Sequence, residues 1–145
     1  MRQGEWRALK RTDFKKVSTP DGPSFLISVN KNLNANGLQL QTKDRRDRLV
    51  PLGEEDWLTA KMAITEYGKV YRGMDLNNFR SRHWKKAVEE VTGVYKVPYT
   101  MRSTAISKYL NEGGTYTMAA RIFGNSAVII EQRYAGLVGV LKPIS

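Results

Sequence analysis

The stretch Phe25-Leu-Ile-Ser-Val29 is a run of apolar and β-branched residues that predicts a buried β-strand. Asp21-Gly22 precedes the run, and the asparagine-rich segment 30–37 follows it. Both flanking segments are typical of turns. Residues 38–41 alternate leucine with glutamine, as a half-buried strand does. The sequence therefore predicts that residues 13–52 form a small antiparallel β-sheet.

The far end of this predicted sheet is charged. Residues 44–47, Asp-Arg-Arg-Asp, are expected to form the tip of a hairpin, and Leu49-Val50 leads out of it. Pro51 is expected to close that strand, because proline lacks the backbone N–H that pairing requires.

Apolar residues recur at helical spacing on both sides of the predicted sheet. A short helix is expected over residues 3–9, with Trp6, Trp57 and Phe123 as core residues. The helices expected after the sheet cover residues 54–71, the segment between an Asn77 or Asn78 cap and Gly93, and residues 100–111, 116–123 and 127–135. Thr115 is expected to cap the fourth of them. The predicted class is α+β: one domain over residues 1–145, with a small antiparallel sheet followed by a helical bundle.

The charge balance favours a polyanionic partner. The 24 lysines and arginines exceed the 14 acidic residues, which gives a formal net charge of +10. DNA is the leading expectation, and a basic domain with an acidic protein partner is the alternative. The sequence has no apolar run long enough for a membrane helix and no cysteine. Disulfides, cysteine-ligated zinc and a cysteine nucleophile are thereby excluded, and the composition suits a reducing cytoplasm.

The reactive residue types point in the same direction. The single histidine, His83, lies among basic residues in a predicted helix, so a histidine-centred triad is disfavoured. There is no carboxylate cluster for a metal and no phosphate-binding loop, and we expect neither metal nor cofactor. Arginine, lysine and tyrosine remain. Arginines can bind phosphate in place of a metal, tyrosine can attack phosphorus, and lysine can protonate a leaving oxygen.

Four blocks of sequence, in order and over nearly the whole chain, resemble the tyrosine recombinase (phage integrase) family. The family patterns are Gly-x-Arg-x-x-Glu-x-x-x-Leu with a later Asp, a hairpin lysine followed by Val-Pro-Leu, His-x-x-Arg, and Leu-Gly-His-Ser with a later Tyr. The corresponding segments are Met1-Arg-Gln-Gly-Glu-Trp-Arg-Ala-Leu9 with Asp13-Phe14, Thr42-Lys43 with Arg48-Leu-Val-Pro-Leu52, Pro98-Tyr-Thr-Met-Arg-Ser-Thr104, and Phe123-Gly-Asn-Ser126 with Gln132-Arg-Tyr-Ala135.

The resemblance implies a role for each matching residue. Arg2 and Arg102 would clamp the scissile phosphate, and Lys43 would be the general acid. Tyr134 would be the nucleophile and would carry a 3′-phosphotyrosyl bond. The implied fold is the recombinase catalytic domain, without its N-terminal core-binding domain and first catalytic helices. The implied activity is site-specific DNA recombination and integration for a phage, prophage or other mobile element.

Two positions depart from the family pattern, because Tyr99 and Asn125 stand where histidines are usual. Tyrosine is a weak base at neutral pH, and an amide cannot relay a proton as imidazole does. The cations of the predicted hairpin would contact the DNA backbone: Arg45, Arg46 and Arg48.

The resemblance also implies double-stranded DNA as partner, a homotetramer on paired sites and a nucleoid-associated place in a bacterial cytoplasm. One alternative is a catalytically decayed DNA-binding protein on the same scaffold. The other is a basic protein-interaction domain.

Overall fold

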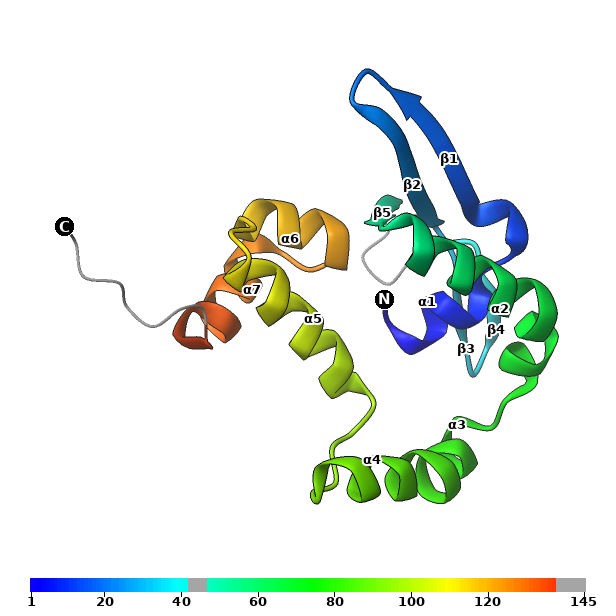
Figure 1. Ribbon diagram of the computed structural model, residues 1–145. Helices are drawn as coiled ribbons and strands as arrows, with labels where there is room; N and C mark the ends of the chain where they lie inside the picture. Colours follow the sequence, from blue (N-terminus) through cyan, green and yellow to red (C-terminus); the bar gives the residue numbers. More distant parts are fainter. Residues whose placement is uncertain (42–46, 138–145) are drawn as a thin grey trace.

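The computed structural model describes residues 1–41 and 47–137. The predictions for Lys43, Arg45 and Arg46 therefore lie outside the described residues. The predicted α+β class is confirmed: a small antiparallel sheet and a set of helices make up the chain (Figure 1). Helix α1 (Gln3–Ala8) and a 3₁₀ helix (Arg11–Asp13) come before the sheet, and the remaining helices follow it.

The main sheet has three strands in the order β1-β2-β5, namely Phe14–Thr19, Gly22–Val29 and Arg48–Leu52. All its pairings are antiparallel, with Ile27 of the central strand opposite Val50 of β5. Strand β2 contains the predicted apolar run, and its alternate residues Phe25, Ile27 and Val29 are buried. The period of two places these three side chains on one face, where they form the core.

The hairpin tip predicted at residues 44–47 lies largely outside the described residues. Among the described strands, β5 pairs with β2, while β3 (Asn32–Asn34) and β4 (Gly37–Gln39) form a separate hairpin. The prediction for Pro51 is wrong. Pro51 lies inside β5, opposite Leu26, and does not end the strand. Strand β5 is at the edge of its sheet, where a residue without an N–H is tolerated.

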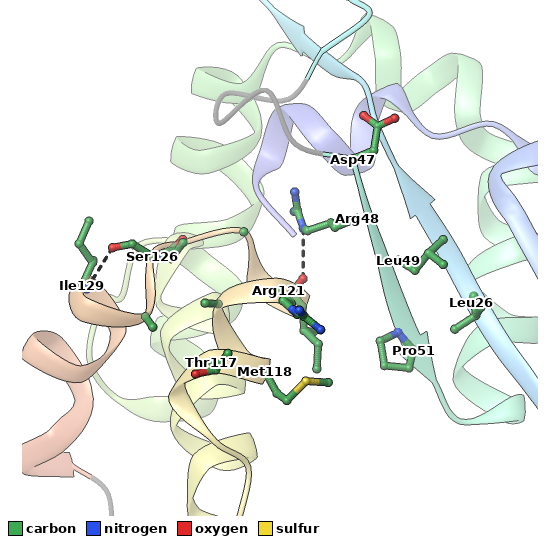
Figure 2. A pocket seen from close by; sticks show the side chains of 15 residues that line it. Leu26, Asp47, Arg48, Leu49, Pro51, Thr117, Met118, Arg121, Ser126 and Ile129 are labelled. Atoms are coloured by element: carbon green, nitrogen blue, oxygen red, sulfur yellow. Dashed lines mark hydrogen bonds between the residues drawn. The ribbon is translucent and has the colours of Figure 1, made fainter.

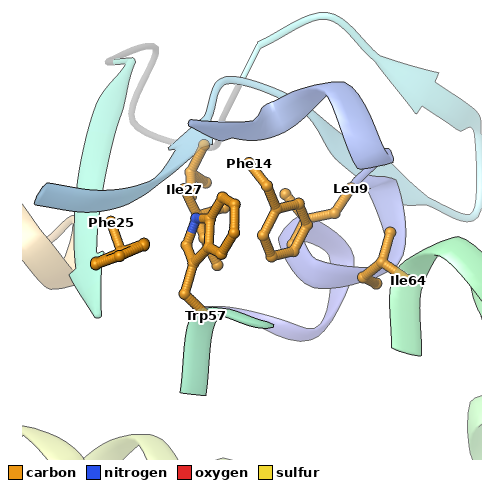
Figure 3. Close-up of a cluster of buried hydrophobic side chains, with 7 residues drawn as sticks. Leu9, Phe14, Phe25, Ile27, Trp57 and Ile64 are labelled. Carbon is orange, nitrogen blue, oxygen red and sulfur yellow. The ribbon is translucent and has the colours of Figure 1, made fainter. Parts of the chain in front are cut away.

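Helix α2 (Glu54–Gly73) covers the buried face of the sheet. Its Trp57 packs edge-on against Phe14 at a ring distance of 6.0 Å and is tilted against Phe25 at 5.5 Å (Figure 3). The indole N–H of Trp57 donates to the carbonyl of Leu26 at 2.9 Å, so its polar atom is satisfied. The core positions expected for Trp6 and Trp57 are confirmed, although Trp6 is only partly buried.

The second predicted helix after the sheet is a composite of α3 (Leu76–Asn78), a π-helical stretch (Phe79–Trp84) and α4 (Lys85–Thr92). Its cap is Asp75, whose side chain accepts two backbone N–H groups, and neither Asn77 nor Asn78 has that role. Aspartate at this position also favours the positive end of the helix dipole. Gly93 ends α4 in the left-handed conformation with φ of 73°, as predicted.

The last three helices, α5 (Tyr99–Asn111), α6 (Tyr116–Phe123) and α7 (Ala127–Tyr134), form a second core. Phe123 packs against this core, as expected. Thr115 caps α6, and Ser126 caps α7 in the same way. Helix α6 lies beside β5, which brings its C-terminal end close to the start of α1 (Figure 1). Within residues 1–41 and 47–137, no helix is long and apolar enough to cross a membrane.

Candidate functional site

Three arginines from three different elements converge on the C-terminal end of α6. Arg48, at the start of β5, donates from Nε to the carbonyl of residue 122 at 3.1 Å. Arg102, in α5, donates to the carbonyl of residue 123. Arg2, before α1, donates from Nη2 to the carbonyl of residue 124 at 2.7 Å. The last carbonyls of a helix lack partners within the helix and carry its partial negative charge, so they attract cations to this point.

Asn125 lies between two of these arginines. Its Oδ1 accepts a hydrogen bond from Nη2 of Arg102 at 2.6 Å and lies 3.5 Å from Nη2 of Arg2. Gly124 ends α6 with φ of 69°, and this left-handed turn presents Asn125 to the arginines. The structure thus brings together three residues that the sequence predicted for one site, although Arg2 and Asn125 are 123 positions apart.

A buried carboxylate holds two of the cations. Glu5 is 1% exposed; its Oε2 accepts from Nη2 of Arg48 at 2.5 Å, and its Oε1 accepts from Nη1 of Arg2 at 3.2 Å. Burial acts to raise the pKa of Glu5, but hydrogen bonds from the Arg48 side chain and the Arg2 backbone outweigh it, so the pKa lies below its ordinary value of 4.5. Glu5 is therefore ionised at neutral pH, and one carboxylate faces three guanidinium groups.

Arg102 is the most deeply buried of the three arginines, with 5% of its surface exposed. Burial lowers its pKa, and the nearby Tyr99 acts in the opposite direction. Among the described residues, Nε and Nη1 of Arg102 have no hydrogen-bond partner. Buried N–H groups without an acceptor are costly, and an anion that accepted from one of them would lower that cost. We call Arg2, Arg48, Arg102, Glu5 and Asn125 the arginine cluster.

Tyr134 contacts Ser103 on α5, the helix that also carries Arg102. Its ring is buried in the second core, with 6% of the residue exposed. Its hydroxyl donates to Oγ of Ser103 at 3.2 Å, and within the described part of the chain it bonds to none of the three arginines. Tyr99 is half-exposed one turn before Arg102 on α5. The structure therefore gathers Arg2, Arg102 and Asn125, and it joins Tyr134 to the residue that follows Arg102 in sequence.

A cleft of about 1060 Å³ runs between β5 and the α6–α7 turn (Figure 2). Three residues of its wall connect it to the arginine cluster: Arg48 and Asn125 belong to the cluster, and Gly124 adjoins it. Much of the remaining wall is apolar, including Leu49 and Met118. The cluster therefore borders a space that a ligand larger than a single anion can enter.

Sequence reasoning missed the inward position of Arg48, which it placed among the hairpin cations. The side chain of Arg48 is only 7% exposed and is held by Glu5. Glu5 itself lies in the first block that resembles the family, but it received no role. No group of three or more possible metal ligands occurs in residues 1–41 and 47–137.

Comparisons with known proteins return nothing for this chain: no family model, no curated protein and no solved structure matches it. Its function is therefore inferred from the residues of the site.

Proposed function

We propose that this chain is the catalytic domain of a tyrosine recombinase, which breaks and rejoins DNA through a 3′-phosphotyrosyl intermediate. The observation that carries the proposal is the meeting of Arg2, Arg102 and Asn125. Arg2 and Asn125 come from blocks of sequence near opposite ends of the chain, and Arg102 comes from a block between them. The resemblance assigned all three to one catalytic site, with Arg2 and Arg102 on the phosphate, and hydrogen-bond distances join them.

The charges and open donors of the cluster suit a phosphodiester. Arginine is a strong donor to phosphate oxygens, and two donors of Arg102, Nε and Nη1 on different edges of the guanidinium, have no partner among the described residues. Three guanidinium groups and one carboxylate leave an excess of positive charge in a largely buried place. Fixed cations of this kind stabilise the charge that develops on phosphate oxygens during attack.

The proposed reaction needs no metal. The hydroxyl of Tyr134 would lose its proton to water, and its oxygen would bond to phosphorus as the bond to the 5′ oxygen breaks; Lys43 would protonate the departing 5′ oxygen. Attack by a 5′-hydroxyl on the phosphotyrosine would then rejoin a strand and release the tyrosine. Because one phosphoester replaces another at each step, no external energy source is required. The hydroxyl of Tyr134 has to leave Ser103 before it can attack.

Double-stranded DNA is the proposed partner, in keeping with the net charge of +10. The same proposal includes a homotetramer that assembles on paired DNA sites in a bacterial cytoplasm. Its reaction would recombine the DNA of a mobile element. The exposed cations of the described residues would add contacts to the DNA backbone that do not depend on sequence.

A trapping assay tests the proposal. The complete natural protein is incubated with nicked duplexes made from DNA that flanks its gene, so that the short fragment released by cleavage diffuses away. A covalent protein–DNA product on a denaturing gel is the expected result. The same duplexes, titrated at increasing salt, should show an affinity that falls steeply as counterions compete.

One observation favours a second function, DNA binding without catalysis. The hydroxyl of Tyr134 is buried and occupied by Ser103, and Asn125 cannot relay a proton. Salt-sensitive binding with no covalent product from any flanking duplex would support this decayed form. Binding that is absent at low salt would instead favour a basic domain that recognises a protein.

A further inference from the structure

Arg48 lies in an unusual position for a residue expected to contact the DNA backbone. Its guanidinium donates in two directions, to Oε2 of Glu5 at 2.5 Å and to the carbonyl of Ile122 at 3.1 Å. The side chain is 7% exposed, so most of it is withdrawn from any external strand. Arg48 therefore joins the edge strand β5 to α1 and to the end of α6.

The guanidinium of Arg48 leaves no room for a side chain at position 124. A Cβ atom on Gly124 would lie 2.8 Å from both Cζ and Nη1 of Arg48, which is closer than side chains approach. The residue also has φ of 69°, which a side chain would strain. The flat face of the guanidinium thus rests against the turn that carries Asn125.

One partner of Arg48, Glu5, is shared with Arg2, and the other, the carbonyl of Ile122, comes just before the two carbonyls that bind Arg102 and Arg2. A shift of Arg48 would therefore move Glu5 and the turn together, and with them the donors of both arginines. Catalytic groups tolerate little displacement, because a shift of about 1 Å can cost about 100-fold in rate.

We propose that Arg48 is a positioning residue: it fixes Glu5 and the Gly124–Asn125 turn so that Arg2 and Arg102 point at one phosphate. This inference rests on the proposed function, and it gives Arg48 a task distinct from holding DNA. An arginine is required because its planar fork binds Glu5 and a carbonyl at once, whereas the ammonium of lysine is a single point charge.

The test compares two substitutions that both replace arginine by lysine beside the same cleft. Arg48→Lys alters the cluster, and Arg121→Lys alters an exposed arginine on α6. Gly124→Ala is a third variant, because it displaces Arg48 without removing it. For each complete protein, three quantities are measured: the DNA Kd over a range of salt, the rate constant of covalent attachment at saturating DNA, and the free energy of unfolding in urea.

The proposal predicts that the rate constant of covalent attachment falls while the DNA affinity stays the same. Arg48→Lys and Gly124→Ala should lower the rate constant at saturating DNA by about 10- to 100-fold. Their Kd values and salt dependence should stay near those of the wild type, because no charge is lost. Arg121→Lys should keep the wild-type rate constant.

Three results would overturn the proposal, and only the last of them also overturns the proposed function. If Arg48→Lys attaches to DNA as fast as the wild type once corrected for its folded fraction, Arg48 only supports the fold and the proposed function stands. The same holds if Arg48→Lys weakens DNA binding without slowing attachment, since Arg48 is then a backbone contact. If the wild type itself forms no covalent product, both the positioning role and the proposed function fail.

Discussion

The hydroxyl of Tyr134 donates a hydrogen bond to Oγ of Ser103, which directly follows Arg102 in α5. The two residues are 31 positions apart, and the contact ties the end of α7 to the helix that carries the buried arginine. In this structure the hydroxyl of the proposed nucleophile is therefore bonded to a neutral partner on the helix that carries Arg102.

The Tyr134–Ser103 contact should be measurable as a coupling energy. Ser103→Ala and Tyr134→Phe each remove one partner, and the double variant removes both. We expect a coupling of about 0.5 to 1.5 kcal/mol in the free energy of unfolding, the usual net value of such a hydrogen bond. Urea denaturation of the four proteins supplies the numbers. Strictly additive effects would show that the contact contributes nothing in solution.

Asn125→Asp should separate stability from function. The substitution keeps the shape of the side chain and places a carboxylate 2.6 Å from a nitrogen of Arg102. A charge-assisted hydrogen bond is stronger than a neutral one, so the free energy of unfolding should rise by about 1 kcal/mol. DNA affinity should fall, because the new charge offsets one of the cations.

Asn36→Asp is the matched control, because it changes the net charge equally at an exposed position in the β3–β4 turn. It should leave stability near the wild-type value and weaken DNA binding less. If both variants weaken binding to the same extent, proximity of the charge to Arg102 has no special effect.

The ionised state of Glu5 makes a prediction about pH. Its folded pKa lies below 4.5, so its ion pairs add stability above the unfolded pKa, and this stability is lost as the pH falls through the folded pKa. Glu5→Gln removes the charge but keeps the size, and it should cost about 3 to 5 kcal/mol near neutral pH. The difference from the wild type should shrink as the pH is lowered into the acid range.

Urea unfolding at a series of pH values measures that difference. Glu90→Gln, an exposed substitution on α4, should show almost no change at any pH. A cost for Glu5→Gln that stays constant down to strongly acid pH would contradict the assigned ionisation.

The parts of the fold that follow from short-range chemistry were predictable. The αL glycines at 93 and 124 and the hydroxyl cap at Thr115 act on backbone groups only a few residues away, so the local sequence was sufficient. The apolar run of β2 likewise predicted its own burial.

The features that were missed depend on contacts distant in sequence. Strand β5 pairs with β2 because Val50 then lies opposite Ile27 over the core, and a local pattern cannot choose that partner. The burial of Arg48 depends on Glu5, 43 positions away, and a charge run on its own suggests a solvated surface. The π-helical stretch 79–84 has no signal that we could identify in the sequence.

The site itself was predictable only as a set of residues. The resemblance named Arg2, Arg102, Asn125 and Tyr134, and the first three do meet. Their orientation was not predictable, because the carbonyls of α6 and the carboxylate of Glu5 set it.

The central claim is that Tyr134 forms a covalent bond with DNA, and mapping the adduct tests it most directly. Covalent product from the nicked duplexes is digested with nuclease and trypsin, and the modified peptide is identified by mass spectrometry. Trypsin cleaves after Arg133, so Tyr134 is the first residue of its peptide and the only tyrosine among residues 134–145. We predict that this peptide carries the nucleotide, that Tyr134→Phe forms no adduct while still binding DNA, and that Tyr109→Phe in the same core retains it. An adduct on any other residue, or one that persists in Tyr134→Phe, would contradict the account.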